Sequence, residues 1–380
     1  MTDALATPQA APAKPGIVPT FRAVLKKAIE LQASDIHISA GGPYRVRIRD
    51  QIAPVTGVAP LGPDEVAAIV AEILTVAKKA TPESAAALME DLQDLDCSYA
   101  LSGVGRFRVN ICSQRGSLAV VLRAIPDSIP SVTDLGLPKV VGDLALEDRG
   151  LVLVTGVTGS GKSTTLAAMV ALINQRRAAK IVTIEDPIEF LHPDQRSIVV
   201  QRELGGDTQS FSSALRAALR QDPDVIMVGE MRDKETIDIV LKAAETGHLV
   251  LSTAHTTDAV KTISRLVSVF DSTEQTNIRL RLSESLLAVV SQRLLPRKEG
   301  KGQIPAVEVM RQTAAIQEYI ADPGRTAEIR DLIAEGRTQY GMQTFDQHLN
   351  DLFHAGLISE ETAVAAATSP GDFARNLQFQ

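Results

Sequence analysis

The chain has 380 residues, of which 44% are hydrophobic and 22% are charged, and its formal net charge is −7. These values are typical of a globular protein long enough for two or three domains. The acidic balance, the 3% aromatic content and the absence of tryptophan argue against a broad basic or base-stacking surface for nucleic acid.

Cys97 and Cys112 are the only cysteines, too few for a tetracysteine zinc site. No secretory signal pattern and no membrane-spanning apolar stretch are visible in the sequence. We therefore expect reduced thiols and a cytoplasmic protein that reaches any membrane through partners.

The first part of the chain is predicted to be a disordered tail followed by an α+β domain. Residues 1–18 are mainly Ala, Pro, Thr and Gln, a composition that cannot offset the entropy of ordering. Over 19–127, helical and alternating apolar spacing predict helices packed on a mostly antiparallel sheet. The helices are expected from Phe21 on, at 64–77 and at 83–92, and the strands at 34–39, 44–49, 96–101, 106–114 and 117–125.

The second half begins after a proline-containing segment, 128–148, which we expect to be a linker. From Arg149 on, short β-branched strands alternate with helices, which predicts a parallel, doubly wound α/β sheet over 149–300. Beyond Thr257 the pattern turns mainly helical, so 301–380 is predicted to be a helical C-terminal region. The expected strands are 151–155, 180–184, 225–228 and 248–253, and the expected helices are 162–175, 211–221 and 234–246.

A glycine-rich segment follows the first of these strands. Residues 156–163 read Gly-Val-Thr-Gly-Ser-Gly-Lys-Ser, the G-x-x-x-x-G-K-[ST] pattern. Its glycines let several backbone N–H groups point at phosphate oxygens, and the next helix directs its positive end at the same oxygens. We predict that the chain binds ATP or another nucleoside triphosphate, with Lys162 at the β/γ-phosphates and the Ser163 hydroxyl on Mg²⁺. The predicted nucleotide-binding residues are Gly156, Thr158, Gly159, Ser160, Gly161, Lys162, Ser163 and Thr164.

Acidic residues follow the second strand of this domain. Parallel sheets place ligand chemistry beyond the carboxyl ends of their strands, so Glu185, Asp186 and Glu189 are predicted to lie beside the phosphate loop. Mg²⁺ or its waters would take carboxylate oxygens there. The alternative is an acidic, solvated turn ended by Pro187.

The third strand delivers Glu230 as the first carboxylate past its end, with Gly229 where an aspartate is usual. A glutamate there can orient and polarise an attacking water, so Glu230 is our candidate general base. The alternative is an ion pair with Arg232 or Arg220. Asp224 begins the same strand and therefore lies at the wrong end for metal binding.

His255 follows the fourth strand, within reach of a γ-phosphate that it could sense, or of a water that it could hold. His248 precedes the strand, where a structural or interdomain role is expected. A core histidine without function is the alternative for both, and neither has the neighbours of a metal site.

Arg106, Arg108, Arg115 and Arg123 lie on the last predicted strands of the first domain. Arg106 and Arg108 are two residues apart and should project to one face. Guanidinium groups match phosphate oxygens and can act as fingers over a γ-phosphate. A solvated basic strand face is the alternative, and the pattern alone favours it.

Together these segments resemble the bacterial secretion ATPases, and within them the PilT family of type IV pilus retraction ATPases, over about 21–377. The resemblance implies a RecA-like P-loop ATPase core behind a PAS-like N-terminal domain, six copies in a ring, and ATP-driven removal of pilin at an inner-membrane pilus platform protein. It rests on four ordered motifs, at 156–165 (Walker A), 183–190 (Asp box), 228–236 (Walker B) and 246–257 (His box).

The same resemblance implies roles for individual residues. Glu230 would be the catalytic glutamate, Glu185 would place Mg²⁺ or its water, and His255 would lie near the γ-phosphate. Arg108 and Arg123 match the N-domain arginines that approach the phosphates across a domain interface.

A retraction role is favoured by the lack of a tetracysteine insertion and by residues 328–335, Glu-Ile-Arg-Asp-Leu-Ile-Ala-Glu, which share five of eight positions with the retraction signature Ala-Ile-Arg-Asn-Leu-Ile-Arg-Glu. The spacing predicts an amphipathic helix whose face of Ile329, Leu332 and Ile333 docks a partner or neighbour. The incomplete signature leaves open an accessory, paralogous retraction ATPase, and pilus-assembly or type II secretion ATPases share the core. A nucleic-acid translocase and a non-hydrolysing nucleotide sensor are alternatives of another class.

Overall fold

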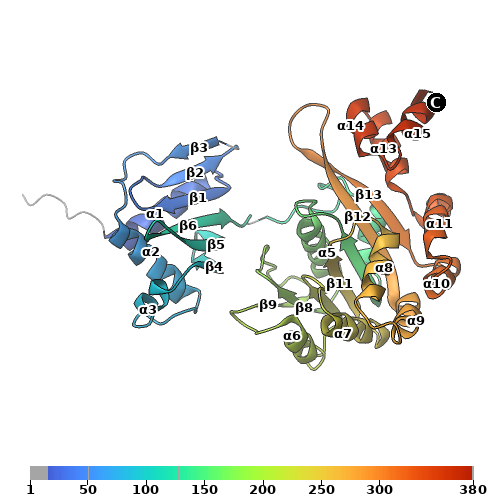
Figure 1. Ribbon diagram of the computed structural model, residues 1–380, viewed down its shortest axis with the longest axis horizontal. Helices are drawn as coiled ribbons and strands as arrows, with labels where there is room; N and C mark the ends of the chain where they lie inside the picture. Colours follow the sequence, from blue (N-terminus) through green and yellow to red (C-terminus); the bar gives the residue numbers. More distant parts are fainter. Residues whose placement is uncertain (1–15, 50, 127, 379–380) are drawn as a thin grey trace, which may run out of the picture. The chain divides into compact units, whose positions relative to one another are not determined.

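The computed structural model describes residues 16–49, 51–126 and 128–378, and it divides into two compact units, 1–127 and 128–380 (Figure 1). Most of the predicted disordered tail, up to residue 15, lies outside the described residues. Ile17 and Val18 do not belong to a tail, because helix α1 (Ile17–Glu30) begins there and its apolar side packs in the first unit.

The first unit is a six-stranded sheet with helices on one face. The strand order is β3-β2-β1-β6-β5-β4, and every neighbouring pair is antiparallel. Helices α1 and α2 (Pro63–Val76) bury Phe21 and Ile69 against strand residues such as Ile36. The other elements are α3 (Ala85–Glu90), β1 (Asp35–Ser39), β2 (Arg45–Ile48), β3 (Gln51–Pro54), β4 (Asp94–Leu101), β5 (Gly105–Gln114) and β6 (Ser117–Ala124).

The sequence pattern missed strand β3, which pairs with β2 at the edge of this sheet. All four of its residues are exposed, so the strand lacks the buried alternate positions that give a strand its apolar period. Backbone pairing with β2, rather than side-chain burial, holds this strand in the sheet.

The second unit is a seven-stranded sheet of order β13-β12-β7-β11-β10-β8-β9, in which every pair is parallel except β12 with β13. This confirms the mixed α/β fold with a parallel sheet. Four strands match the prediction closely: β7 (Gly150–Thr155), β8 (Lys180–Glu185), β10 (Val225–Val228) and β11 (Leu249–Ala254).

Helices cover both faces of this sheet. Apolar residues of α4 (Lys139–Ala145) and α5 (Lys162–Arg176) pack with Val152 and Val154 on one face. Leu151 and Leu153 face the other way and pack with the opposite helical layer. That layer is formed by α6 (Phe211–Ala218), α7 (Lys234–Glu245), α8 (Ala259–Ser268), α9 (Gln275–Ser285), α10 (Ala314–Ala321) and α11 (Ile329–Glu335).

The expected linker, 128–148, is part of the second unit. Val132, Leu137, Val141 and Leu144 are buried in the same core as the sheet residues, and Pro138 precedes helix α4 instead of marking an open connector. The proline content was misleading because proline is also favourable just before or at the start of a helix.

The prediction that the chain is mainly helical after Thr257 is wrong for residues 286–311, which form strands β12 (Leu286–Pro296) and β13 (Gln303–Arg311). These strands form an antiparallel hairpin, and β12 pairs in parallel with β7. An apolar run of this kind has no period that separates a buried strand from a buried helix. Strand β9 (Ile198–Glu203) at the opposite edge was also missed.

Short helices complete the C-terminal region. Helices α13 (Phe345–His354), α14 (Glu360–Ala366) and α15 (Pro370–Gln378) pack with Leu295 and Ile304 of the β12–β13 hairpin (Figure 1). The predicted amphipathic helix exists as α11, but Ile329 and Ile333 are buried in the core of this unit instead of being offered to a partner. The remaining short elements are η1 (Thr326–Glu328) and α12 (Arg337–Tyr340).

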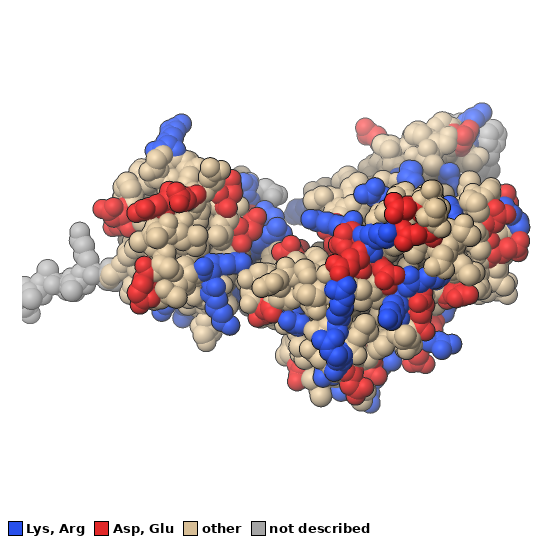
Figure 2. All heavy atoms as spheres, turned by 60° about the horizontal axis from the view of Figure 1, so that its bottom comes forward, with Lys and Arg blue, Asp and Glu red and all other residues tan. Residues whose placement is uncertain are grey.

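Charges of both signs are mixed on one face of the molecule. On the face drawn in Figure 2, Lys and Arg side chains of the second unit are interspersed with Asp and Glu side chains. A face with mixed charge lacks the single-sign field that steers nucleic acid. Over the part of the chain that the structure describes, no helix combines the length and the apolar character needed to cross a bilayer.

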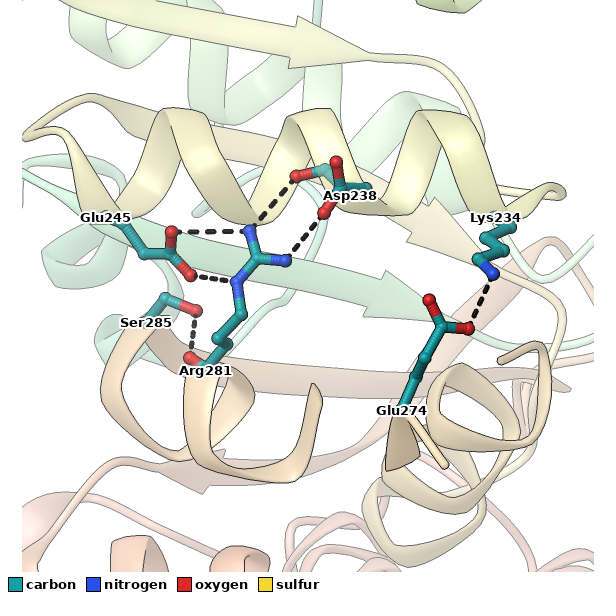
Figure 3. Close-up of polar contacts among 6 residues, drawn as sticks. All are labelled: Lys234, Asp238, Glu245, Glu274, Arg281 and Ser285. Carbon is teal, nitrogen blue, oxygen red and sulfur yellow. Dashed lines mark hydrogen bonds and ion pairs between the residues drawn. The ribbon is translucent and has the colours of Figure 1, made fainter. Parts of the chain in front are cut away.

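An ion-pair network joins α7 to α9 (Figure 3). Arg281 of α9 contacts Asp238 and Glu245 of α7, each at 2.6 Å, and Lys234 at the start of α7 contacts Glu274 just before α9 at 2.5 Å. A guanidinium shared by two carboxylates orders both helices more than a single exposed pair would. The network ties the helix that follows β10 to the helix that leads into β12.

Docking of α13 on β13 should depend on pH. His348 is buried, and its Nδ1 accepts a hydrogen bond from the Val307 N–H at 2.9 Å. Burial lowers the pKa of His348 to about 4, from 6.5. The unfolded chain therefore takes up the proton first, so this stability is complete above pH 6.5 and is lost as the pH falls toward 4.

We predict that His348→Asn, which retains an acceptor near the Nδ1 position, loses less stability on acidification than the wild type. Between pH 6.5 and 4.5 the difference should grow by up to ~1.4 kcal/mol per pH unit, measured by urea unfolding. His354→Asn, on an exposed histidine of the same helix, is the control and should follow the wild type. Parallel pH profiles for all three proteins would contradict the prediction. His192, whose pKa burial also lowers to about 4, contributes equally to all three.

Candidate nucleotide site

The phosphate loop connects β7 to α5 in the strand–loop–helix arrangement that the sequence predicted. Gly156, Gly159 and Gly161 have φ values of 149°, 78° and 86°, in the region that favours glycine. Lys162 opens helix α5 and is buried, and its Nζ donates to the carbonyl oxygens of Gly156 at 2.9 Å and Val157 at 3.0 Å. The loop is thus closed on itself around the lysine, at the positive end of α5.

The predicted hydroxyl residues of this loop differ in exposure. Ser163 is exposed and Thr164 is half-buried in the first turn of α5, Thr158 is exposed at the loop tip, and Ser160 is buried. An exposed serine hydroxyl at this position fits the oxygen ligand that Mg²⁺ takes beside nucleotide phosphates. Within the described ranges, no cluster of three His, Cys, Asp or Glu residues could hold a metal by itself.

Residues of β12 and β13 line the cavity beside the loop, and the sequence did not predict them. This cavity has a volume of about 350 Å³ and is lined by the loop from Gly156 to Ser160 together with Thr257. The additional lining residues are Gln292, Arg293, Leu294 and Gln303. The only signal for them in the sequence is the polar Ser-Gln-Arg triplet inside the apolar run of 286–295.

Glu185 ends β8 as predicted, but its carboxylate points into the protein. Oε1 accepts from the Thr183 hydroxyl at 2.6 Å and from Gln201 Nε2 at 3.1 Å, and only 8% of the residue is exposed. Burial raises the pKa of Glu185, against the lowering effect of these hydrogen bonds. The residue is therefore a buried, hydrogen-bonded group, whereas Asp186 is exposed and Glu189 is half-buried.

Glu230 follows β10 and lies close to Arg232 and His255. Its Oε1 lies 2.7 Å from Arg232 Nε and 3.4 Å from His255 Nε2. The alternative, a strand-end ion pair with Arg232, is therefore present, and His255 shares the same carboxylate oxygen. The carboxyl ends of β10 and β11 are adjacent in the sheet, which explains the meeting.

The charges of Glu230 and Glu189 also act on Lys162. Burial lowers its pKa, and the negative charges of Glu230 and Glu189 act in the opposite direction. The loop lysine and the acidic residues past β8 and β10 therefore share one electrostatic environment at this edge of the sheet.

The loop after β11 is fixed behind His255. Asp258 accepts from the Lys261 N–H at 2.8 Å as the N-cap of α8, and Glu308 of β13 accepts from the Ala259 N–H at 2.9 Å. Burial raises the pKa of Glu308 to about 7. Because the start of α8 is capped and buried, the backbone just after the exposed His255 is held in place.

Two residues predicted to be remote from the site are indeed remote. Asp224 accepts from the Lys180 N–H at 2.7 Å, at the amino ends of β8 and β10. His248 precedes β11, and its Nδ1 lies 2.9 Å from the Ala243 carbonyl oxygen. His248 therefore has a structural partner at the opposite edge of the sheet.

The arginines of the first unit do not form one cluster. Arg108 of β5 lies directly opposite Arg123 of β6, and both are exposed. Arg123 Nε donates to the buried Asp35 at 2.8 Å, and Arg106 donates to Ser98 Oγ at 2.9 Å. Arg115 is excluded from this group because it lies in the turn after β5, at the other end of the strand, with φ of 49°.

The two cysteines form no disulfide: Cys97 is buried and Cys112 is half-buried. Both lie on strands of the first unit, β4 and β5, as the apolar pattern around them predicted.

Comparison with known proteins gives consistent relatives. The profile of the type II/IV secretion system protein family matches residues 11–368. The type IV pilus retraction ATPase PilT of Pseudomonas aeruginosa is 44% identical over 341 residues, which cover 90% of this chain and 96% of that protein. The type IV pilus ATPase PilU of the same organism is 39% identical over 354 residues, which cover 93% and 90%.

Solved structures agree with these sequence relatives. The crystal structure of the pilus retraction motor PilT with bound ADP matches with a TM-score of 0.83 and 44% identity, covering 93% of this chain and 98% of that one. The ATPase DotB of Legionella pneumophila matches with a TM-score of 0.73 and 28% identity, covering 95% and 98%.

The geometry of the loop predicts unequal costs for two glycine substitutions. A Cβ on Gly156 would lie 2.4 Å from Ser160 Oγ and 2.5 Å from the Gln292 carbonyl oxygen, whereas a Cβ on Gly159 would meet nothing within 4 Å. Both glycines have positive φ, so both substitutions carry backbone strain on the order of 1–3 kcal/mol. Gly156→Ala should cost a further 1–3 kcal/mol, roughly, for overpacking. Urea unfolding without nucleotide measures both, and an equal or greater loss for Gly159→Ala would contradict this reading of the loop.

Proposed function

The chain belongs to the type II/IV secretion system protein family, and from that premise we propose that it is a Mg²⁺-dependent ATPase motor that powers type IV pilus retraction and twitching motility. We further propose that it works as a homohexamer. The observation that carries the proposal is the meeting of the phosphate loop with Glu230 and His255 at one edge of the parallel sheet. A binding site alone would not need an oriented carboxylate there.

The relatives support the pilus assignment. The names of two Pseudomonas aeruginosa relatives that cover most of this chain specify the type IV pilus, and that of PilT specifies retraction. A twitching motility protein of Neisseria gonorrhoeae is 48% identical over 270 residues. The PilT structure with bound ADP supports a nucleotide ligand for this fold.

Binding of the nucleotide would be the task of the loop and the helix behind it. Backbone N–H groups from Gly159 to Thr164 and the Lys162 ammonium are suited to phosphate oxygens, and the exposed Ser163 hydroxyl would hold Mg²⁺. When bound, Mg²⁺ neutralises charge on the phosphate oxygens. Glu185, buried and hydrogen-bonded, would act on the metal only through water.

Hydrolysis would use Glu230 as general base. Its carboxylate would accept the proton of a water that attacks the γ-phosphate, while Arg232 and His255 hold the carboxylate in place. We propose that Arg108 and Arg123 stabilise the negative charge that develops on the γ-phosphate, because guanidinium groups match phosphate oxygens. Loss of the γ-phosphate would release this contact and let the ring deform.

The remaining assignments are part of the same proposal. We place the protein in the cytoplasm, peripheral to the inner membrane through a pilus platform protein, with a paralogous retraction ATPase as a further partner. An accessory role in retraction is the second candidate, because the chain also matches PilU over 93% of its length. Nucleic-acid translocation is disfavoured by the net charge of −7 and by the mixed charge on the face drawn in Figure 2.

The general-base assignment predicts that Glu230→Gln separates turnover from binding. Phosphate release should fall by roughly 10²- to 10⁴-fold, the usual contribution of a general base, while ADP affinity stays within a few-fold of the wild type. Asp224→Asn, an equal change at the other end of the same strand, is the matched control and should retain activity. Near-normal turnover of Glu230→Gln would remove the residue from this role.

The pilus assignment predicts a cellular outcome. Deletion of the gene in a piliated host should leave excess surface pili and abolish twitching, because pilin would still be added but no longer removed. Counting pili by electron microscopy checks this. Loss of all pili would instead indicate an assembly motor, and retraction that continues would indicate the accessory role.

A further inference from the structure

Gln292 of β12 connects the phosphate loop to the helix behind it. Its Nε2 donates to the Ser160 carbonyl oxygen at 2.5 Å, and its Oε1 accepts from the Thr165 hydroxyl at 2.9 Å. The residue is 2% exposed, so neither end of the amide is satisfied by bulk water. A buried amide with both ends used is costly to replace, because its partners would be left without hydrogen bonds.

The register of the sheet places Gln292 beside the loop. Ser291 pairs with Thr155, the last residue of β7, so the next residue of β12 runs alongside the first residue of the loop. The Gln292 carbonyl oxygen would lie 2.5 Å from a Cβ on Gly156, and its Nε2 would lie 3.0 Å from a Cβ on Gly161. The glycines of the loop are therefore required in part by the approach of this one residue.

The hydrogen bond to Ser160 also fixes a donor of the loop. In a planar trans peptide, the C=O of one residue and the N–H of the next point in opposite directions. Holding the Ser160 carbonyl toward β12 therefore turns the Gly161 N–H away from β12. Backbone N–H groups of this segment are the phosphate donors of the proposed function.

Strand β12 is itself held from its other side. The guanidinium of Arg293 stacks on the Phe345 ring at 4.0 Å and donates to the Ala366 carbonyl oxygen at 2.7 Å. Neighbouring strand residues project to opposite faces, so Gln292 and Arg293 fasten β12 to the loop and to helices α13 and α14 respectively. Gln292 thus contacts the loop from a rigid support.

We propose that Gln292 is a positioning residue for nucleotide binding, which holds the Ser160–Gly161 peptide in its phosphate-binding orientation and fixes the loop on α5. The proposal rests on the proposed function only in taking this loop as the phosphate site. Gln292 acts through the loop backbone and is not itself assigned to the reacting atoms.

Three variants of the full chain test the proposal. Gln292→Met removes both hydrogen bonds at similar length, Thr165→Val removes only the bond to α5, and Ser291→Ala removes a buried hydroxyl on the same strand that bonds Thr155 and not the loop. Calorimetric titration with Mg·ADP should show a loss of about tenfold or more for Gln292→Met. Thr165→Val should lose less, and Ser291→Ala should match the wild type. Thermal unfolding without nucleotide monitors the fold.

Gln292→Glu distinguishes a positioning role from a purely structural one through the pH dependence of ADP affinity. A protonated glutamic acid offers the same donor and acceptor as glutamine, whereas the carboxylate cannot donate to Ser160. Burial raises the pKa of such a group, so its ADP affinity relative to the wild type should recover as the pH falls from 8 to 6. This arm also decides the case in which Gln292→Met fails to fold.

Affinity of folded Gln292→Met within about twofold of the wild type overturns the proposal, as does a pH-independent ratio for Gln292→Glu. Failure of the proposed function is distinguishable. If the wild type binds Mg·ADP but releases no phosphate from ATP, the motor assignment fails while the comparison of affinities still tests Gln292. If the wild type hydrolyses ATP and the variants bind normally, only the role of Gln292 fails.

Discussion

Close contact between the phosphate loop and strand β12 is the constraint on which the second unit depends. The loop residue that packs against the strand can have no side chain, because a Cβ on Gly156 would clash with the Gln292 carbonyl oxygen. Parallel pairing of β12 with β7 brings that carbonyl to the loop, and the β12–β13 hairpin then supports helices α13 to α15. Sheet register, glycine placement and the packing of the C-terminal helices thus all involve the same strand, β12.

Burial of polar groups around that contact organises the electrostatics of the site. Lys162, Glu185 and Gln292 are each less than 10% exposed, and each has hydrogen-bond partners within its own unit. Fixed partners at a poorly solvated edge hold these polar groups in defined orientations. Glu230 is held by Arg232 and His255 at the same edge, so the proposed base and the glycine-rich loop share one environment.

In the first unit, two arginines lie directly opposite each other on neighbouring strands. Arg108 and Arg123 face each other across β5 and β6, and like charges directly opposite destabilise a sheet. Asp35, the next residue in that cross-strand row, offsets the repulsion by accepting from Arg123. Burial opposes ionisation of Asp35, but the hydrogen bonds of Arg123 and Ser34 prevail and lower its pKa. The ionised Asp35 carboxylate therefore lies beside the exposed arginine pair and orients Arg123.

The phosphate loop, the four strands around it and the carboxylates at their ends could be predicted from the amino-acid sequence, because a glycine pattern and uninterrupted apolar strands have few other structural solutions. It failed at β12, β13 and the 128–148 segment, where apolar runs and prolines fit more than one structure until their packing partners are known. Three features became visible only in the folded chain: the inward orientation of Glu185, the contacts of Glu230 with both Arg232 and His255, and the contact of Gln292 with the loop. Each joins residues far apart in the chain through hydrogen bonds that a one-dimensional pattern does not contain.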